Sequence, residues 1–177
     1  LMSKRGAALE TEYRYLHPGW SGEANLFALP HDLQTGQQRW ALRSTQRGAL
    51  DLAGGLRYDW SVQRVSDGDY WKDGLRGAES LTPRLLSSSG RLRQNRLLRT
   101  DSWLGDVEQR LYARVQQWQL LQYSTSTTQI TTPYQRAPQV GAQWSDHGGP
   151  LQWSVQTEVN RFTNVDATQM QGSRAHL

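Results

Sequence analysis

The residues best placed by their spacing to do chemistry are the acidic side chains of the segment Ser66–Gly74. Three aspartates, Asp67, Asp69 and Asp73, fall within this segment, and closely spaced carboxylates are typical of calcium-binding loops. Counted from Asp67, the fifth position of such a loop is Trp71 and the twelfth is Ala78, and neither side chain can bind calcium. The segment therefore does not predict an EF-hand, and a polar loop exposed to water is the simplest interpretation.

Nucleophilic catalysis finds little support in the sequence. A nucleophile elbow needs the pattern G-x-S-x-G, and Gly19–Glu23 lacks the final glycine. The four histidines are scattered over predicted turns and loops, with no serine or carboxylate at a spacing that suggests a dyad: His17, His31, His147 and His176. There are no cysteines and hence no thiolate metal site. We therefore expect no enzyme, no catalytic residues, no metal site and no cofactor.

Polar side chains at every second position are the remaining candidates for a functional surface. One group lies in the segment after Leu56, and a second lies in the segment after Leu151. The two groups are Arg57, Asp59 and Gln63, and Gln156, Glu158 and Asn160. A further pair, Arg110 and Arg114, lies in Val107–Leu121, where Gln117 and Gln119 share a face with apolar residues and leave the facing open. Because successive side chains of a β-strand point to opposite faces, each group shares one face of its strand.

The elements that would position these residues are long β-strands with one apolar face. From Leu50 to Val62 every second residue is apolar or glycine, and Leu151–Asn160 repeats the alternation. A strand of about 13 residues exceeds the ~9–11 that a tilted strand needs to cross a bilayer, and a strand of a soluble sandwich is roughly half as long. Such a repeat is typical of transmembrane β-barrels, whose polar face lines the lumen.

Walking the alternation along the chain predicts eight strands and the start of a ninth. Their ranges are Ala8–Leu16, Gly22–Leu29, Arg39–Gln46, Leu50–Val65, Arg96–Trp103, Val107–Leu121, Gln139–Ser145, Leu151–Phe162 and Gly172 onward. Short connections (His17–Ser21, Arg47–Ala49, Leu104–Asp106, Asp146–Pro150) alternate with long ones (Pro30–Gln38, Ser66–Asn95, Gln122–Pro138, Thr163–Gln171). An antiparallel meander then places all short turns on one rim and all long loops on the other, as in outer-membrane barrels.

On this topology the acidic segment belongs to a long extracellular loop. If this loop has a function, we expect it to form a cap over the mouth of the barrel, with Tyr70 and Trp71 packing against neighbouring segments. The polar groups on the strands would project into the lumen. There, mixed charge suits either a hydrated path for a substrate or a protein plug.

Composition agrees with a wall that meets water on one side. Only 36% of the residues are hydrophobic and the mean hydropathy is −0.75, which is lean for a compact core. No apolar run approaches the ~18 residues of a membrane helix, but barrel strands carry a much weaker signal than helices. The chain is therefore not excluded from a membrane by its hydropathy.

The chain is basic, with a formal net charge of +4. Of its 20 basic residues, Lys4 and Lys72 are the only lysines and the other 18 are arginines. The planar guanidinium of arginine suits phosphate and carboxylate partners, although an arginine-rich genome would produce the same bias. Because the arginines alternate with acidic and amide residues and form no basic run, we expect no nucleic-acid partner.

The first residues do not predict a secretory leader. Leu1–Leu16 contains Lys4 and Arg5 but no apolar h-region. Since an outer-membrane protein must carry a signal peptide, we expect the chain to be an interior piece of a longer protein.

Several motifs, taken in order, resemble the C-terminal barrel of the LptD family, which assembles lipopolysaccharide in the Gram-negative outer membrane. The segment 65–73 is similar to the family pattern V-S-D-x-x-Y-[FW]-x-D, 117–119 to Q-[FW]-Q and 133–139 to P-Y-x-R-x-P-Q. The other matching segments are Glu12–Leu16, Ser21–Glu23, Leu29–Asp32, Arg161–Phe162 and Arg174–Leu177. The resemblance covers nearly the whole chain, but Ser80–Asn95 does not match residue by residue.

The resemblance implies a function and a set of partners. The alternation predicts an all-β chain, an antiparallel meander of about 8–9 long strands, and the resemblance implies that this meander is a segment of a large outer-membrane β-barrel wall. The remaining strands and an N-terminal periplasmic jellyroll would lie outside residues 1–177. The implied partners are lipopolysaccharide, an LptE-like lipoprotein plug, outer-membrane lipids and, through the missing N-terminal domain, a periplasmic lipopolysaccharide-bridge protein.

Two alternatives share part of this pattern. A generic porin or a siderophore-type receptor wall would have the same fold but a different cargo. A soluble lectin-like sandwich would bind sugars through its tryptophans and would pack its apolar faces against a second layer.

Overall fold

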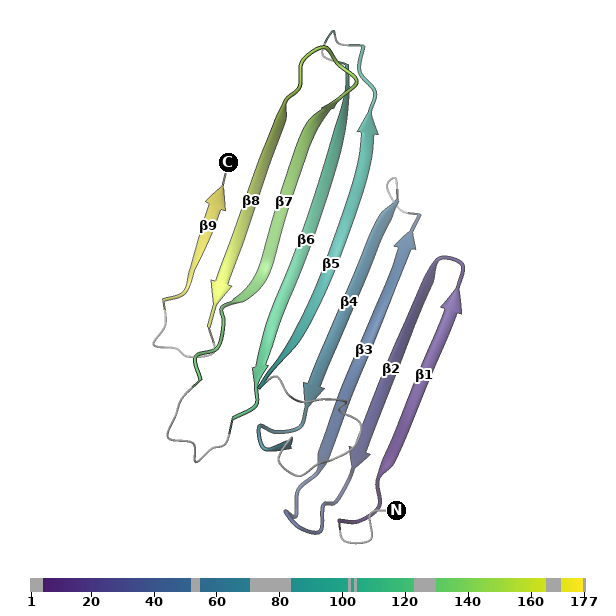
Figure 1. Ribbon diagram of the computed structural model, residues 1–177, viewed down its shortest axis with the longest axis vertical. Coiled ribbons are helices and arrows are strands. Elements are labelled where there is room, and N and C mark those ends of the chain that lie inside the picture. The colour runs from purple at the N-terminus through teal and green to yellow at the C-terminus, as the bar shows by residue number, and fades with distance from the viewer. Residues whose placement is uncertain are drawn as a thin grey trace. The chain divides into compact units, whose positions relative to one another are not determined.

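A computed structural model describes residues 5–51, 55–70, 84–101, 103, 105–122, 130–164 and 170–176. Nine strands form one sheet in which each strand neighbours the next in sequence (Figure 1). They are β1 (Leu9–His17), β2 (Trp20–Leu29), β3 (Arg39–Leu50), β4 (Leu56–Val65), β5 (Leu85–Leu98), β6 (Asp106–Leu120), β7 (Gln135–His147), β8 (Ser154–Thr163) and β9 (Gly172–His176). The predicted all-β antiparallel meander, including its ninth strand, is confirmed.

The boundary between β3 and β4 differs from the prediction. The sequence predicted a turn at Arg47–Ala49 and one strand from Leu50 to Val65, but β3 continues to Leu50 and β4 begins only at Leu56. Gly55 adopts a φ of 87° in the connection, a conformation that a side chain disfavours. The alternation of apolar residues runs on through the turn in the same phase, and for this reason it concealed the break.

The start of β5 was also predicted wrongly. The strand begins at Leu85, whereas Ser66–Asn95 was expected to be a loop and the strand was expected to span Arg96–Trp103. Its first half carries the polar run Ser87–Gly90, which has no apolar alternation to reveal a strand. β7 likewise starts at Gln135, before the predicted Gln139, and β8 starts at Ser154, after the predicted Leu151.

The register of β6 to β9 fixes which side chains share a face. Gln143 lies opposite Gln156, Gly141 lies opposite Glu158 and Gln139 lies opposite Asn160, so these residues alternate with the apolar pairs along β7 and β8. The register shifts between Arg136 and Gln139, around Ala137–Pro138, where the peptide bond is cis. Between these two pairs β7 has one residue more than β8, and beyond the shift Arg136 lies opposite Phe162.

Contacts divide the chain into two compact units. The first comprises Leu1–Gln46, Trp60–Ser88 and Trp118–Pro133, and the second comprises Arg47–Asp59, Ser89–Gln117 and Tyr134–Leu177. The first unit holds the cluster of buried apolar residues, Phe27, Leu29, Ala41, Val65, Tyr70, Leu86 and Leu121. In the same unit the Gln119 side chain donates to the carbonyl of Val65 (2.8 Å) and accepts from its N–H (3.1 Å), which ties β6 to the end of β4.

On the apolar face of the second unit, large side chains remain uncovered. Val140 is 48% exposed, and Val155 and Val159 on β8 are 49% and 56% exposed. Val159 lies opposite Val140, so these side chains form part of one apolar surface. Contiguous exposed apolar side chains mark a surface that meets a membrane or a partner. Within the described residues, no helix has the length and hydropathy needed to cross a membrane.

Candidate functional site

The polar face of β6, β7 and β8 is organised around the carboxylate of Glu158. The Tyr112 hydroxyl and the Gln139 side-chain amide donate hydrogen bonds to its Oε2, the latter at 2.8 Å. The Asn160 amide donates to Oε1. The Gln156 amide donates to the Tyr112 hydroxyl at 3.4 Å and thereby joins the same network. All three predicted residues of β8 are therefore brought together.

Tyr112 reaches Glu158 because a glycine lies beneath its ring. Gly141 is opposite both Tyr112 on β6 and Glu158 on β8. A Cβ atom at Gly141 would lie only 2.3 Å from Cζ of Tyr112. Sequence reasoning named Glu158 but missed Tyr112, Gln139 and Gly141, which the cross-strand register brings to it.

Asp59 on β4 is the centre of a second polar group. The Nη2 atom of Arg93 lies 3.5 Å from Oδ1 of Asp59, and the Nε atom of Arg91 lies 3.7 Å from Oδ2. Arg57, two residues before Asp59 on the same strand, is exposed and makes no hydrogen bond or ion pair with the described residues. Gln63 belongs to the first unit, and its backbone makes two hydrogen bonds with the Ser88 side chain. Its N–H donates to Ser88 Oγ, and its carbonyl accepts from that hydroxyl.

The described residues that follow β4, 66–70, contribute Tyr70 to the apolar cluster of the first unit. Tyr70 is completely buried, and its ring meets the ring of Phe27 edge-on, with 6.5 Å between the centroids. Burial raises the pKa of Tyr70 above its usual range. Asp67 accepts hydrogen bonds from the Ser66 hydroxyl (2.6 Å) and from the backbone N–H of Asp69 (3.1 Å). Trp71 and Asp73, also predicted for this loop motif, lie outside the described residues.

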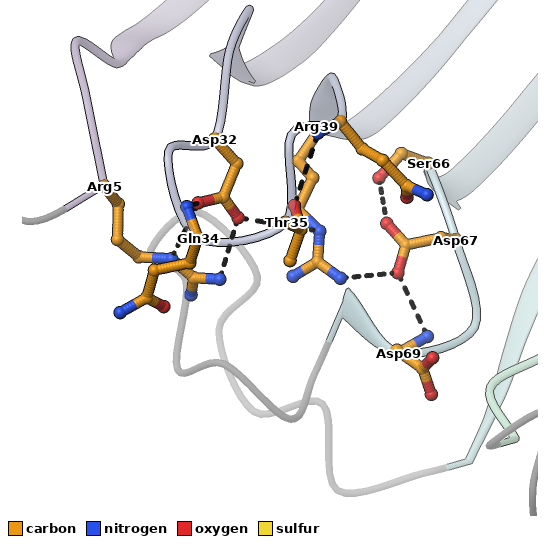
Figure 2. A network of polar contacts seen from close by, with 9 residues as sticks. Arg5, Asp32, Gln34, Thr35, Arg39, Ser66, Asp67 and Asp69 are labelled. Atoms are coloured by element: carbon orange, nitrogen blue, oxygen red, sulfur yellow. Dashed lines mark hydrogen bonds and ion pairs between the residues drawn. The ribbon is translucent and has the colours of Figure 1, made fainter.

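Buried ion pairs connect this loop to two other segments (Figure 2). Arg39, at the start of β3, donates from Nη2 to Oδ1 of Asp67 at 3.0 Å, and its Nε lies 3.9 Å from Oδ2 of Asp32. Arg5 donates from Nε and Nη2 to the two carboxylate oxygens of Asp32, at 3.2 and 2.8 Å. Both guanidiniums and the Asp32 carboxylate are almost entirely buried.

The pKa of Asp32 results from opposing effects. Burial raises it, but hydrogen bonds from the backbone N–H of Gln34 and from the Arg5 and Thr35 side chains outweigh burial, so the pKa lies below its usual value. Asp32 also closes its own loop, because its carbonyl accepts from the N–H groups of Thr35 and Gly36. Among the described residues, no group of three His, Asp or Glu side chains could hold a metal ion.

Comparison with known proteins identifies the family. Residues 37–177 match the family model LptD, described as LPS transport system D. The chain belongs to the LptD family. Similar relatives are the LPS-assembly proteins LptD of Albidiferax ferrireducens (33% identical, 97% of this chain and 21% of the relative) and of Alkalilimnicola ehrlichii (34%, 99% and 22%). The protein of the same name from Bordetella pertussis is 32% identical over 89% of this chain and 19% of its own length.

The LptD family resemblance predicted from the sequence is thus confirmed. The matched residues include three of the motifs that carried it, at 65–73, 117–119 and 133–139, whereas the earlier motif Glu12–Leu16 precedes them. The chain spans about a fifth of the length of the LptD relatives it matches.

Sequence reasoning missed the buried charges of this LptD-family chain. Asp32 was noticed only as part of the motif Leu29–Asp32, and Arg5 and Arg39 were not singled out. No sequence signal could have paired them, because Arg5 and Asp32 are 27 residues apart and lie outside the strands.

Proposed function

We propose that this chain is a segment of a transmembrane β-barrel wall that takes part in lipopolysaccharide assembly in the Gram-negative outer membrane. Membership of the LptD family and the names of its relatives support this role. The observation that carries the proposal is the two-sided sheet. One face of β8 holds the Glu158 network, and the other face exposes Val155 and Val159.

The two faces would do different work. The apolar face would contact lipid hydrocarbon and anchor the wall. The polar face would meet water and offer hydrogen bonds and charges to the saccharide or to a protein plug, without any covalent step. The contact residues we propose are Arg57, Asp59, Gln63, Gln156, Glu158 and Asn160. The plug would be an LptE-like lipoprotein, as the family resemblance implies.

The loop after β4 would close the extracellular end of this segment. The buried Tyr70 and the ion pair between Arg39 and Asp67 support an ordered cap. We include Asp67, Asp69, Tyr70, Trp71 and Asp73 in this cap. The rest of the barrel, the N-terminal jellyroll and its contact with a periplasmic bridge protein would belong to the remaining four fifths of the protein.

Photocrosslinking tests the proposed function. A photoactivatable residue replaces Gln156 in the full-length protein, and lipopolysaccharide is supplied through the reconstituted transport pathway. We expect crosslinks to lipopolysaccharide from position 156, and we expect position 155, on the apolar face, to give crosslinks to bulk lipid instead. Absence of any lipopolysaccharide crosslink above background at position 156 would favour a generic porin or receptor wall.

A further inference from the structure

The polar face of β4, β5 and β6 carries more guanidinium groups than its carboxylates can pair. Asp59 is shared by Arg91 and Arg93, and the two contacts, 3.7 and 3.5 Å, are both longer than the 2.7–2.9 Å of a strong charge-assisted hydrogen bond. Because Arg57 is two residues from Asp59, it lies on the same face of β4, and it is exposed. One carboxylate thus serves a surface with several positive charges.

Arg114 on β6 adds a further positive charge to this surface. A Cβ atom at Gly90 of β5 would meet only Val115 of β6, at 3.4 Å, which places these two residues side by side. In an antiparallel pair the next residues on each strand, Arg91 and Arg114, then lie opposite each other on the other face. Like charges in this arrangement repel unless a counter-charge lies between them.

The contacts of Arg114 do not supply that counter-charge. Its Nη2 donates to the neutral side chain of Gln116 at 3.1 Å. Its Nε is buried and has no hydrogen-bond acceptor. A buried donor without an acceptor is costly, so the site is built for a group that brings oxygen atoms and negative charge.

Arg110, on the same face of the same strand, differs from Arg114 because a carboxylate pairs its guanidinium. Its Nε and Nη2 donate to the two carboxylate oxygens of Glu108, at 3.0 and 3.2 Å. This fork-to-fork pair needs no further anion. The positive excess is therefore specific to the four residues around Asp59, which we call the arginine cluster: Arg57, Arg91, Arg93 and Arg114.

We infer that the arginine cluster binds a phosphoryl group. A phosphoryl group carries up to two negative charges on three oxygens, so it can accept from two guanidiniums at once, whereas a single carboxylate already fails to satisfy Arg91 and Arg93. The ligand is a phosphorylated glycolipid that moves along the polar face. This inference rests on the proposed function, because it takes the polar face to be the path of lipopolysaccharide.

Binding of two forms of lipopolysaccharide tests the inference. The full-length protein, its variant R91Q/R114Q and the control R110Q are each titrated with native lipopolysaccharide and with lipopolysaccharide treated with phosphatase. The double variant should bind the native form about tenfold more weakly, as expected for the loss of charge-assisted contacts, and the treated form as wild type does. R110Q should bind both forms as wild type does.

The phosphoryl group could belong to the glycolipid or to free phosphate, and a competition experiment with inorganic phosphate alone distinguishes the two. Preference of the wild type for native over treated lipopolysaccharide, lost in R91Q/R114Q, supports the glycolipid. Equal binding of both forms by wild type overturns the inference, even if millimolar inorganic phosphate binds. The substitution R57Q, at an exposed position, repeats the test if the double variant does not give a folded band on an unheated gel.

Failure of this inference is distinguishable from failure of the proposed function. If position 156 crosslinks to lipopolysaccharide while the cluster does not distinguish the two forms, only the phosphoryl site is wrong. If position 156 gives no such crosslink, the proposed path itself is wrong.

Discussion

Gly141 permits the hydrogen bond between Tyr112 and Glu158, and its replacement by alanine should break that bond. The new Cβ would lie 2.3 Å from Cζ of Tyr112, so the ring must move away from the carboxylate. We expect the free energy of unfolding to fall by about 1–3 kcal/mol. A urea titration of the full-length protein, followed by the mobility of unheated samples on gels, measures the change.

Gly90→Ala is the matched control for this substitution. Its Cβ would meet only Val115 Cγ2, at 3.4 Å, which is ordinary packing. Its free energy of unfolding should stay within about 0.5 kcal/mol of wild type. A similar loss in both variants would show that the strands, and not the Tyr112 contact, are sensitive to any added methyl group.

Asp32 should make the stability of the loop region depend on pH. Its pKa is lower in the folded protein than in the unfolded chain, where it is about 3.9. The ionised carboxylate therefore stabilises the fold above the unfolded pKa, and this contribution is lost as the pH falls through the folded pKa. Proteolysis of the loops, measured between about pH 7 and pH 3, should accelerate towards the acid end of that range.

The variant D32N isolates this contribution. It leaves Arg5 buried beside a neutral amide, and loss of a buried partner costs about 3–5 kcal/mol. Loop proteolysis of D32N should already be fast at neutral pH and should change little on acidification. D101N, at an exposed position of the β5–β6 connection, should behave as wild type. An unchanged pH profile in D32N would assign the acid sensitivity to another group.

At the scale of the strand, the two faces of β8 should tolerate charge very differently. Val155→Arg places a guanidinium on the apolar face and should cost about 2–4 kcal/mol near the bilayer midplane. Gln156→Arg places the same group on the polar face and should cost far less. Urea unfolding of both variants in liposomes measures the difference, and equal costs would contradict the assignment of the faces.

The order in which the strands pair and the face on which each side chain lies were predictable, because both depend on the local alternation of apolar and polar residues. Alternation with a period of two places Gln156 and Glu158 on one face whatever the exact ends of β8 are. The same signal failed where it continued through the turn at Gly55, and where Ser87–Gly90 of β5 carried no apolar residue.

The candidate site was only partly predictable, for a related reason. The residues that complete it come from other strands or loops, as Tyr112 does for Glu158 and Arg39 does for Asp67. Their partners are decided by cross-strand register and by the path of the loops, and neither leaves a mark in the local sequence.

For the molecule as a whole, the chain spans about a fifth of the length of the LptD relatives it matches. Among the described strands, β1 and β9 lie at the two ends of the sheet order, each with one neighbour. Unpaired strand edges bind further strands readily, so under the proposed function further strands would continue the sheet from these edges.

If hydrocarbon meets one face of this sheet and water meets the other, the two faces differ in their access to a water-soluble reagent. Single cysteines are introduced at each position from 155 to 159 of the full-length protein, in a segment that has no cysteine of its own. The protein in liposomes is then treated with a maleimide that cannot enter the membrane, and the rate of labelling is measured at each position. We expect rapid labelling at positions 156 and 158, which share the polar face, and slow labelling at 155, 157 and 159. Uniform labelling, or labelling of the odd positions alone, would contradict this assignment of the two faces.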